Sequence, residues 1–408
     1  AELPRELRAR WFCCALIGSM FFAMPLAASD SISLVLGGDV MTGRGIDQIL
    51  PHPGDPVLYE SYVRDARDYV ALAEKASGRI ERPVDFAYIW GDALPALHAA
   101  DARIINLETS ITRADAPWPA KGINYRMHPE NIGCLTAAKV NGCSLANNHV
   151  LDWGFDGLVE TLATLRSAGI ACAGAGATIE EAAAPIVLSI PNKGRVLMVA
   201  VGLPSSGIPM TWAAGDDKAG LNLLSTLKVE TARKLARDLV ALKRGHDATV
   251  VSIHWGGNWG YEIPVEQIRF AQALVDEGVD VVHGHSSHHP KAIEFRRGGV
   301  ILYGCGDFIN DYEGIPGREE FRNDLALLYR ITIATDPSRR PHVSVLAFKR
   351  EKLRLNRAPE RDVKWLVQNL NEQSAAFGTE AILEPDGTLT IRAISPSATN
   401  APLFNSPR

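Results

Sequence analysis

Short apolar runs alternate with amphipathic segments along most of the chain, a pattern typical of an α/β fold. Runs rich in Val, Ile and Leu predict strands, and apolar residues three or four positions apart predict helices. Strands are expected over residues 31–36, 102–107, 142–145, 170–172, 186–190, 195–201, 248–253, 279–283, 292–295, 300–303, 325–334 and 343–348. Helices are expected over residues 58–78, 92–100, 129–139, 157–168, 225–244, 264–277 and 362–376. Because βαβ units come first and antiparallel strands follow, we expect two sheets packed face to face with helices outside.

Polar residues that can bind a metal follow five of these apolar runs. Because strand ends of this kind meet at one edge of a sheet, we expect the five to form a single site. Their mixture of carboxylate, amide oxygen and imidazole suits Zn, Mn or Fe better than Ca or a thiolate site. There are enough of them for two divalent ions that share a bridging carboxylate. The residues are Asp39, Glu108, Asn148 with His149, His254, and His285 with His288.

The densest of these strand ends is the stretch VVHGHSSHHP at residues 281–290, which holds four of the eleven histidines. His285 and His288 are the ligand candidates, whereas His283 is expected to close the strand and His289 to lie behind the ligands or at the rim. A polar surface loop that happens to be rich in histidine is the simpler alternative. It is disfavoured because similar short loops recur at the other strand ends.

A second dense cluster lies in the stretch ANNHVLDWG, residues 146–154. Asp152 stands close enough to His149 to orient the imidazole ring and raise its basicity. An Asx-turn with a helix-capping Asp would explain one of the two asparagines, but not the whole set.

The amino-terminal segment differs from the rest of the chain. Arg5, Arg8 and Arg10 precede an apolar run over residues 11–28 that ends in small residues. This order predicts a signal peptide over residues 1–29. An uncleaved membrane anchor is the close alternative, and an apolar first helix of the fold is a weaker one. Either of the first two places the following domain outside the cytoplasm.

Composition limits the partners of the chain. The 408 residues carry a formal net charge of -5, and the sequence pI is about 6.2. With 46% hydrophobic residues, the chain can form one large domain or two smaller ones. No basic patch with interleaved aromatic residues is present, so we expect no nucleic-acid partner.

Six motifs in fixed order carry a family resemblance: GGDVMTGR, NLE, ANNHVLDWG, HWG, GHSSHHP and YGCGDFIND. Over residues 31–324 the chain resembles CapA-type proteins of bacterial capsule or poly-γ-glutamate synthesis, whose fold is similar to calcineurin-like metallophosphoesterases. The resemblance implies a four-layer α/β/β/α sandwich over residues 30–355, with a dinuclear metal site between the sheets. Residues 356–408 would form a carboxyl-terminal helix and extension.

The resemblance also implies roles for individual residues. Asp39 would bind the first metal ion, Glu108 would bridge the two ions, and Asn148 and His254 would bind the second, while His285 and His288 match the final motif. His149 would protonate a leaving group with Asp152 as its orienting partner, and Arg44 would bind phosphate or carboxylate, unless it forms a surface salt bridge.

The chain departs from the metallophosphoesterase pattern at some of these positions. Met41 stands where a histidine ligand is usual, and Glu108 where an Asp is usual. His289 competes with His288 for the last ligand position. Asp307 and Asn310 are expected only to cap a turn.

Two functions follow as expectations. The first is an exported metal-dependent hydrolase that cleaves a γ-glutamyl amide or a phosphoester in an anionic polymer or a small-molecule conjugate. The second is a non-hydrolytic, metal-binding accessory protein of poly-γ-glutamate capsule synthesis or export, working with capsule-synthesis proteins of the membrane. The absent histidine at Met41 favours the second, and the cluster around His149 favours the first.

Overall fold

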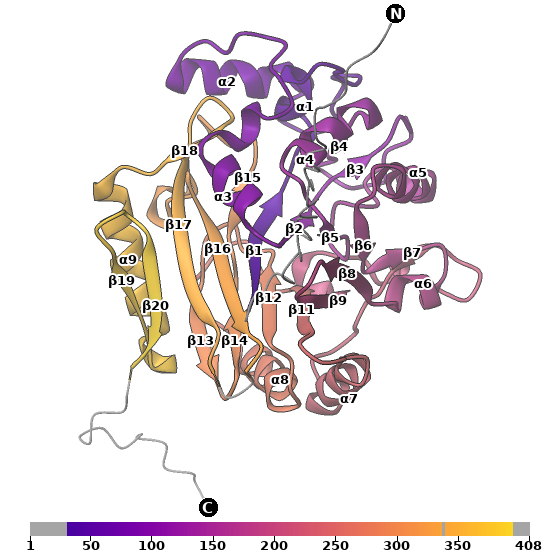
Figure 1. The fold of residues 1–408 in the computed structure, drawn as a ribbon. Helices are drawn as coiled ribbons and strands as arrows, with labels where there is room; N and C mark the ends of the chain where they lie inside the picture. The colour runs from indigo at the N-terminus through magenta and orange to yellow at the C-terminus, as the bar shows by residue number, and fades with distance from the viewer. Residues whose placement is uncertain (1–30, 337–338, 395–408) are drawn as a thin grey trace, which may run out of the picture.

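A computed structural model describes residues 31–336 and 339–394 (Figure 1). Two sheets dominate the fold. The larger sheet has the order β19 (Thr379–Leu383), β20 (Leu389–Ala393), β17 (His342–Arg350), β16 (Leu325–Ala334), β1 (Ser31–Val40), β2 (Ala102–Leu107), β5 (Gly142–Ser144), β6 (Ala171–Ala173), with β15 (Asp307–Ile309) paired to β1 and β18 (Leu355–Arg357) to β17. The smaller sheet has the order β13 (Ile293–Arg296), β14 (Gly299–Leu302), β12 (Val281–His285), β11 (Ala248–His254), β9 (Gly194–Gly202), β8 (Ile186–Ile190).

Helices lie outside the two sheets (Figure 1). They are α1 (Gly45–Ile49), α2 (Arg67–Ser77), α3 (Leu94–Ala99), α4 (Gly133–Ala137), α5 (Gly154–Ser167), α6 (Ile179–Ala183), α7 (Val229–Val240), α8 (Val265–Asp276) and α9 (Glu360–Ser374). Short pairs join β3 (Ser110–Ile111) to β4 (Arg126–Met127), and β7 (Ala175–Gly176) to β10 (Gly220–Leu221). Six 3-10 turns complete the described elements: Tyr88–Ala93, Pro129–Ile132, Pro204–Ser206, Met210–Trp212, Glu319–Phe321 and Ala375–Phe377.

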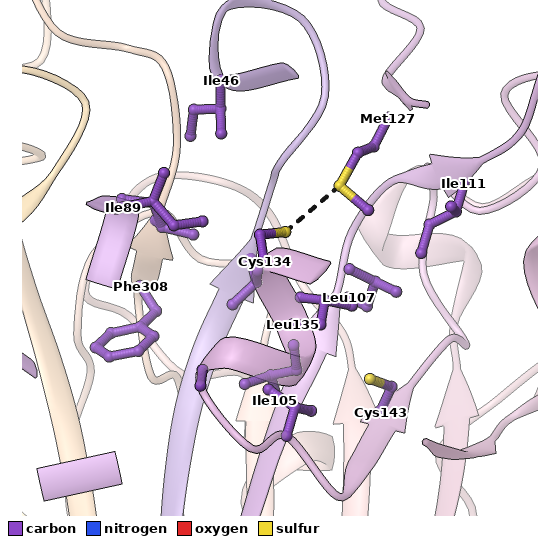
Figure 2. Close-up of a cluster of buried hydrophobic side chains, with 14 of the residues drawn as sticks. Ile46, Ile89, Ile105, Leu107, Ile111, Met127, Cys134, Leu135, Cys143 and Phe308 are labelled. Atoms are coloured by element: carbon purple, nitrogen blue, oxygen red, sulfur yellow. Dashed lines mark hydrogen bonds between the residues drawn. The ribbon is translucent and has the colours of Figure 1, made fainter. Parts of the chain in front are cut away.

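Three large hydrophobic cores fill the spaces between the four layers. The middle core joins the two sheets, with Leu34 of β1 and Val250 of β11 both fully buried. One outer core joins the larger sheet to helices that include α4 and α5, and Figure 2 shows part of it around Leu107 and Leu135. The other joins the smaller sheet to α7 and α8. Each large side chain buried here contributes about 1.5–3 kcal/mol. The predicted α/β/β/α sandwich is therefore confirmed.

The first strand is longer than expected and runs through its glycines to Val40. A Cβ on Gly38 would lie 1.7 Å from the carbonyl oxygen of Gly306, so only glycine allows this approach. The Asp39 amide donates to that same oxygen over 3.1 Å. In the parallel pairing of β1 with β15, Asp39 is in register with Asp307. The close approach thus brings together two acids that are distant in sequence.

Several elements differ from expectation. The helix expected over residues 58–78 is confined to α2, and two strands, β19 and β20, follow α9 and extend the larger sheet. The expected domain boundary at residue 355 falls within β18. The expected signal peptide or anchor at residues 1–29 lies outside the described part of the chain. Within the described part, no helix is both long and apolar enough to cross a bilayer.

Candidate metal centre

Five strand ends meet where the carboxyl edges of the two sheets face each other. Register alone brings several of the expected ligands together, because His254 at the end of β11 pairs with His285 at the end of β12. On the larger sheet, Asp39 pairs with Asn106 of β2, two residues before Glu108. The single site expected from the strand ends is therefore present as a geometric cluster.

One group of possible metal ligands consists of Asp39, His254 and His285. Their ligand atoms all lie within 4.8 Å of one another, and all three residues are buried. The Nδ1 atoms of the two histidines are 2.8 Å apart, and Nδ1 of His285 is 3.9 Å from Oδ1 of Asp39. The Oγ of Ser252 lies 2.8 Å from the other ring nitrogen of His285 and fixes the ring.

A second group consists of Asp39, His288 and Asp307, with ligand atoms again within 4.8 Å of one another. Nδ1 of His288 is 2.7 Å from Oδ1 of Asp307, and the Asn310 side chain donates to Oδ2 of Asp307 over 2.7 Å. The sequence predicts only a turn-capping role for Asp307. The structure gives it more than that, because β15 places it beside Asp39. The signal for it was available: GCGD after an apolar strand repeats the GGD pattern that had singled out Asp39.

Glu108 and Asn148 lie on the other side of His254. Oε1 of Glu108 is 3.9 Å from Nε2 of both His149 and His254, and Oδ1 of Asn148 is 3.0 Å from Nε2 of His254. Glu108 belongs to neither three-residue group, whereas Asp39 belongs to both. In this structure the carboxylate common to the two groups is thus Asp39.

Burial shifts the pKa values of the acids and of the imidazoles in this cluster in opposite directions. Burial, with the nearby Asp307 carboxylate, raises the pKa of Asp39 to about 7. Burial and the charge of Asp39 raise the pKa of Glu108 well above its usual range. Burial, together with neighbouring histidines, lowers the pKa values of His254 and His285 far below the usual range, so both rings are neutral. Although burial opposes it, the Asp307 carboxylate raises the pKa of His288.

The donor set therefore fits divalent cations. A borderline metal would bind the carboxylates and the imidazoles in their deprotonated forms, so its binding would release the protons that burial favours on the acids. Among the residues that the structure describes, no Lys or Arg forms an ion pair with Asp39 or Glu108. A cation at this position would remove the repulsion between the acids.

His149 stands beside the cluster and is held by its neighbours. Its Nδ1 is 2.7 Å from Oδ2 of Asp152, so Nε2 is the ring nitrogen on the side of Glu108. Burial lowers the pKa of His149 to about 4, although the Asp152 carboxylate opposes this. Lys121, which the sequence did not single out, places Nζ 2.7 Å from Oδ1 of Asp152 and 3.1 Å from Nδ1 of His149.

Arg44 lies away from both ligand groups. It is 3% exposed, and its guanidinium donates to Oδ2 of Asp311 over 3.1 Å and to Oε1 of Glu60 over 2.8 Å. It also donates to the Tyr69 hydroxyl and lies over that ring. The salt bridge of Arg44 is therefore buried, and not at the surface as expected. The arrangement also argues against a substrate-binding role, because protein acids already bind the guanidinium.

The remaining candidates of the histidine-rich stretch have separate environments. His283 contacts the carbonyl oxygen of Gly37 through Nε2 over 2.9 Å. His289 is buried between the rings of Tyr261 and Phe321, each with its centroid 4.6 Å from that of His289. Neither residue enters a ligand group among the described residues, and His288 does.

Comparisons with known proteins agree on one family. The family model described as bacterial capsule synthesis protein PGA_cap matches residues 33–312. A probable polyglutamine synthesis accessory protein of Mycobacterium tuberculosis is 46% identical over 89% of this chain and 96% of its own length. The capsule biosynthesis protein CapA of Bacillus anthracis is 23% identical over 69% of this chain and 61% of its own length. The PGA biosynthesis protein CapA of Bacillus subtilis is 24% identical over 70% and 64%.

A solved structure, the 5'-nucleotidase precursor from Thermus thermophilus, also aligns with this chain. It covers 80% of this chain and 53% of its own, with 14% identity and a TM-score of 0.33. A score this low supports no argument about this chain.

Proposed function

The chain belongs to the bacterial capsule synthesis protein family PGA_cap, and we propose from this premise that it is an exported, metal-dependent hydrolase of capsule or polyglutamate metabolism. The observation that carries the proposal is the pair of ligand groups that share Asp39 beside the oriented His149–Asp152 pair. A purely structural cluster would not need Asp39 and Glu108 to be buried beside imidazoles without a Lys or Arg as ion-pair partner.

Two divalent ions, of Zn, Mn or Fe, would be held by Asp39, His254 and His285 on one side, and by Asp39, His288 and Asp307 on the other. Glu108 and Asn148 face the first of these groups through His254. When bound, such ions polarise a substrate oxygen and make water a better nucleophile near neutral pH.

His149 would handle the proton. With Nδ1 turned to Asp152, the neutral ring presents Nε2 to the side of Glu108. It would take up a proton there and pass it to the leaving atom of the substrate. Asp152 would hold the tautomer and orientation of the ring, and Lys121 would balance the charge of Asp152.

The substrate that we propose is an anionic polymer or a small conjugate of it, cleaved at a γ-glutamyl amide or a phosphoester. The names of the relatives support the polymer: one is a capsule biosynthesis protein and another a polyglutamine synthesis accessory protein. Export would bring the protein to the outer face of the cytoplasmic membrane, free or anchored by residues 1–29. There it would meet capsule-synthesis proteins of the membrane.

A non-catalytic accessory protein that uses the metal centre to bind the polymer is the second candidate. Met41 favours it, because a thioether stands where the related phosphoesterases usually have a histidine. The Sδ of Met41 lies 3.5 Å from the Tyr312 hydroxyl, whose ring in turn contacts that of His288. The position is therefore close to the second ligand group, yet it offers no hard donor.

Turnover and metal content, measured together, separate the two candidates. Zinc- or manganese-loaded wild type is incubated with a generic phosphodiester and with γ-glutamyl peptides. For a hydrolase, His149→Ala should lower kcat by about 10²–10⁴-fold with unchanged metal content. His246→Ala, which changes an exposed histidine away from the cluster, serves as the control and should not change kcat. Full metal content without turnover of either substrate class would favour the accessory protein.

A further inference from the structure

We infer that Asp307 is a metal ligand and that it makes one of the two ion sites carboxylate-rich, suited to a manganese-type cation. The other site is imidazole-rich and suited to zinc. The inference rests on the metal centre of the proposed function, but it does not depend on hydrolysis.

The first support is the position of Asp307 relative to Asp39. The two residues are neighbours in parallel strands, and the contact between Gly38 and the Gly306 carbonyl fixes that register. Both acids are almost fully buried, at 0% and 1% exposure. Two buried carboxylates side by side, with no Lys or Arg paired to Asp39 in the described chain, are costly unless a cation or a proton lies between them.

The second support is the difference between the donor sets. Asp39 is common to both, so the sites differ in the residues that complete them. His254 and His285 supply two imidazoles to one site, which suits a borderline ion such as zinc. Asp307 and His288 supply a carboxylate and one imidazole to the other, which suits a harder ion such as manganese.

A positioning role is the competing explanation for Asp307. Its Oδ1 is 2.7 Å from Nδ1 of His288, so it would then only orient that ring. Removing such an outer partner typically lowers metal affinity by about 10–100-fold. Losing a direct ligand should exceed about 100-fold, so the size of the effect separates the two roles.

The test measures binding of each ion to the full chain. Metal-free protein is loaded with one equivalent of zinc, and manganese is then titrated while electron paramagnetic resonance follows the free ion. Wild type should bind one equivalent of manganese beside the zinc. Asp307→Asn should weaken manganese binding by more than about 100-fold and keep its zinc. His288→Gln should do the same, and His254→Ala should lose zinc instead.

Glu294→Gln is the matched control, because it also neutralises a buried carboxylate but one bonded to Gln272 and Tyr303. It should bind both ions as wild type does. Retained zinc shows that Asp307→Asn is folded, and His288→Gln provides an independent route to the same site. A loss below about 100-fold in Asp307→Asn, an equal loss of both ions, or no manganese binding by wild type would overturn the inference. Absence of turnover would count against the hydrolase alone.

Discussion

Two buried clusters of charge lie near the same sheet edge, and they are built on opposite principles. Around Arg44, the acids Glu60 and Asp311 flank a guanidinium that is the counter-charge of both, and the Tyr69 hydroxyl completes the network. Around Asp39, Glu108 and Asp307 add further acids, and among the described residues only histidines lie within ion-pair distance of these carboxylates.

The difference indicates which cluster is complete within the fold and which is suited to bind a cation. A buried ion cluster that contains its own counter-charges is complete without a ligand. The Asp39 cluster instead raises the pKa of its own acids by burial and mutual repulsion. The buried acids therefore lower the stability of the metal-free fold, and a bound cation would offset this loss.

Breaking the balanced cluster should have the largest effect. Arg44→Met leaves Glu60 and Asp311 buried without their partner, and removal of one member of a buried pair typically costs about 3–5 kcal/mol. Urea denaturation with and without a chelator should show the same loss, because the metal groups do not include Arg44. Arg44→Lys keeps the charge but not the fork, so its loss should be smaller. Equal stability of Arg44→Met and wild type would contradict the structural role.

Completing the unbalanced cluster should have the next largest effect. Zinc at about 100 times its dissociation constant should raise the free energy of unfolding by about 2.7 kcal/mol. Thermal or urea denaturation, with zinc and with excess chelator, measures this difference. The stability of His254→Ala should respond much less to zinc, because this variant lacks one imidazole of the first ligand group. Glu294→Gln should respond as wild type does, and an unresponsive wild type would rule out a structural contribution from the ion.

Much of this contrast could be predicted from local sequence, and some of it could not. Asp39, His254 and His285 each stand at the end of a long apolar run, so one window shows both strand and ligand. Five such ends in series predicted one site, because parallel strands deliver their ends to a common edge. The same local reasoning predicted strands over residues 186–190 and 195–201, and the structure contains them as β8 and β9.

Long-range pairing limited the rest. β15 is three residues long, and its partner β1 lies 268 positions earlier at the Asp39–Asp307 pair, so no window shows Asp307 beside Asp39. The same distance hides the environment of Arg44, since its partner Asp311 is 267 residues away. Which acid neutralises which base depends on the tertiary fold, whereas which strand ends in an acid does not.

The smallest effect, and the sharpest contrast, should come from removing one acid of the unbalanced cluster. The pKa of Asp39 is raised from 3.8 to about 7 by burial and by Asp307. Between these values the folded state holds a proton that the unfolded state releases, so the stability of the metal-free protein falls as pH rises. Asp39→Asn cannot ionise and should lack this part of the slope.

At pH 8, and without metal, Asp39→Asn should therefore be more stable than wild type, because it removes a buried charge. We expect a gain of only about 1–2 kcal/mol, because the amide loses part of the hydrogen bonding that Asn106 and Ser286 give the acid. At pH 4 the difference should vanish or reverse, because Asp39 is then protonated in the folded state. Urea denaturation across this range measures both, and zinc should reverse the order at pH 8 by stabilising only the wild type. If the variant is less stable than metal-free wild type at every pH, the hydrogen bonds of Asp39 stabilise the fold by more than its buried charge destabilises it. The Asp39 cluster would then resemble the Arg44 cluster.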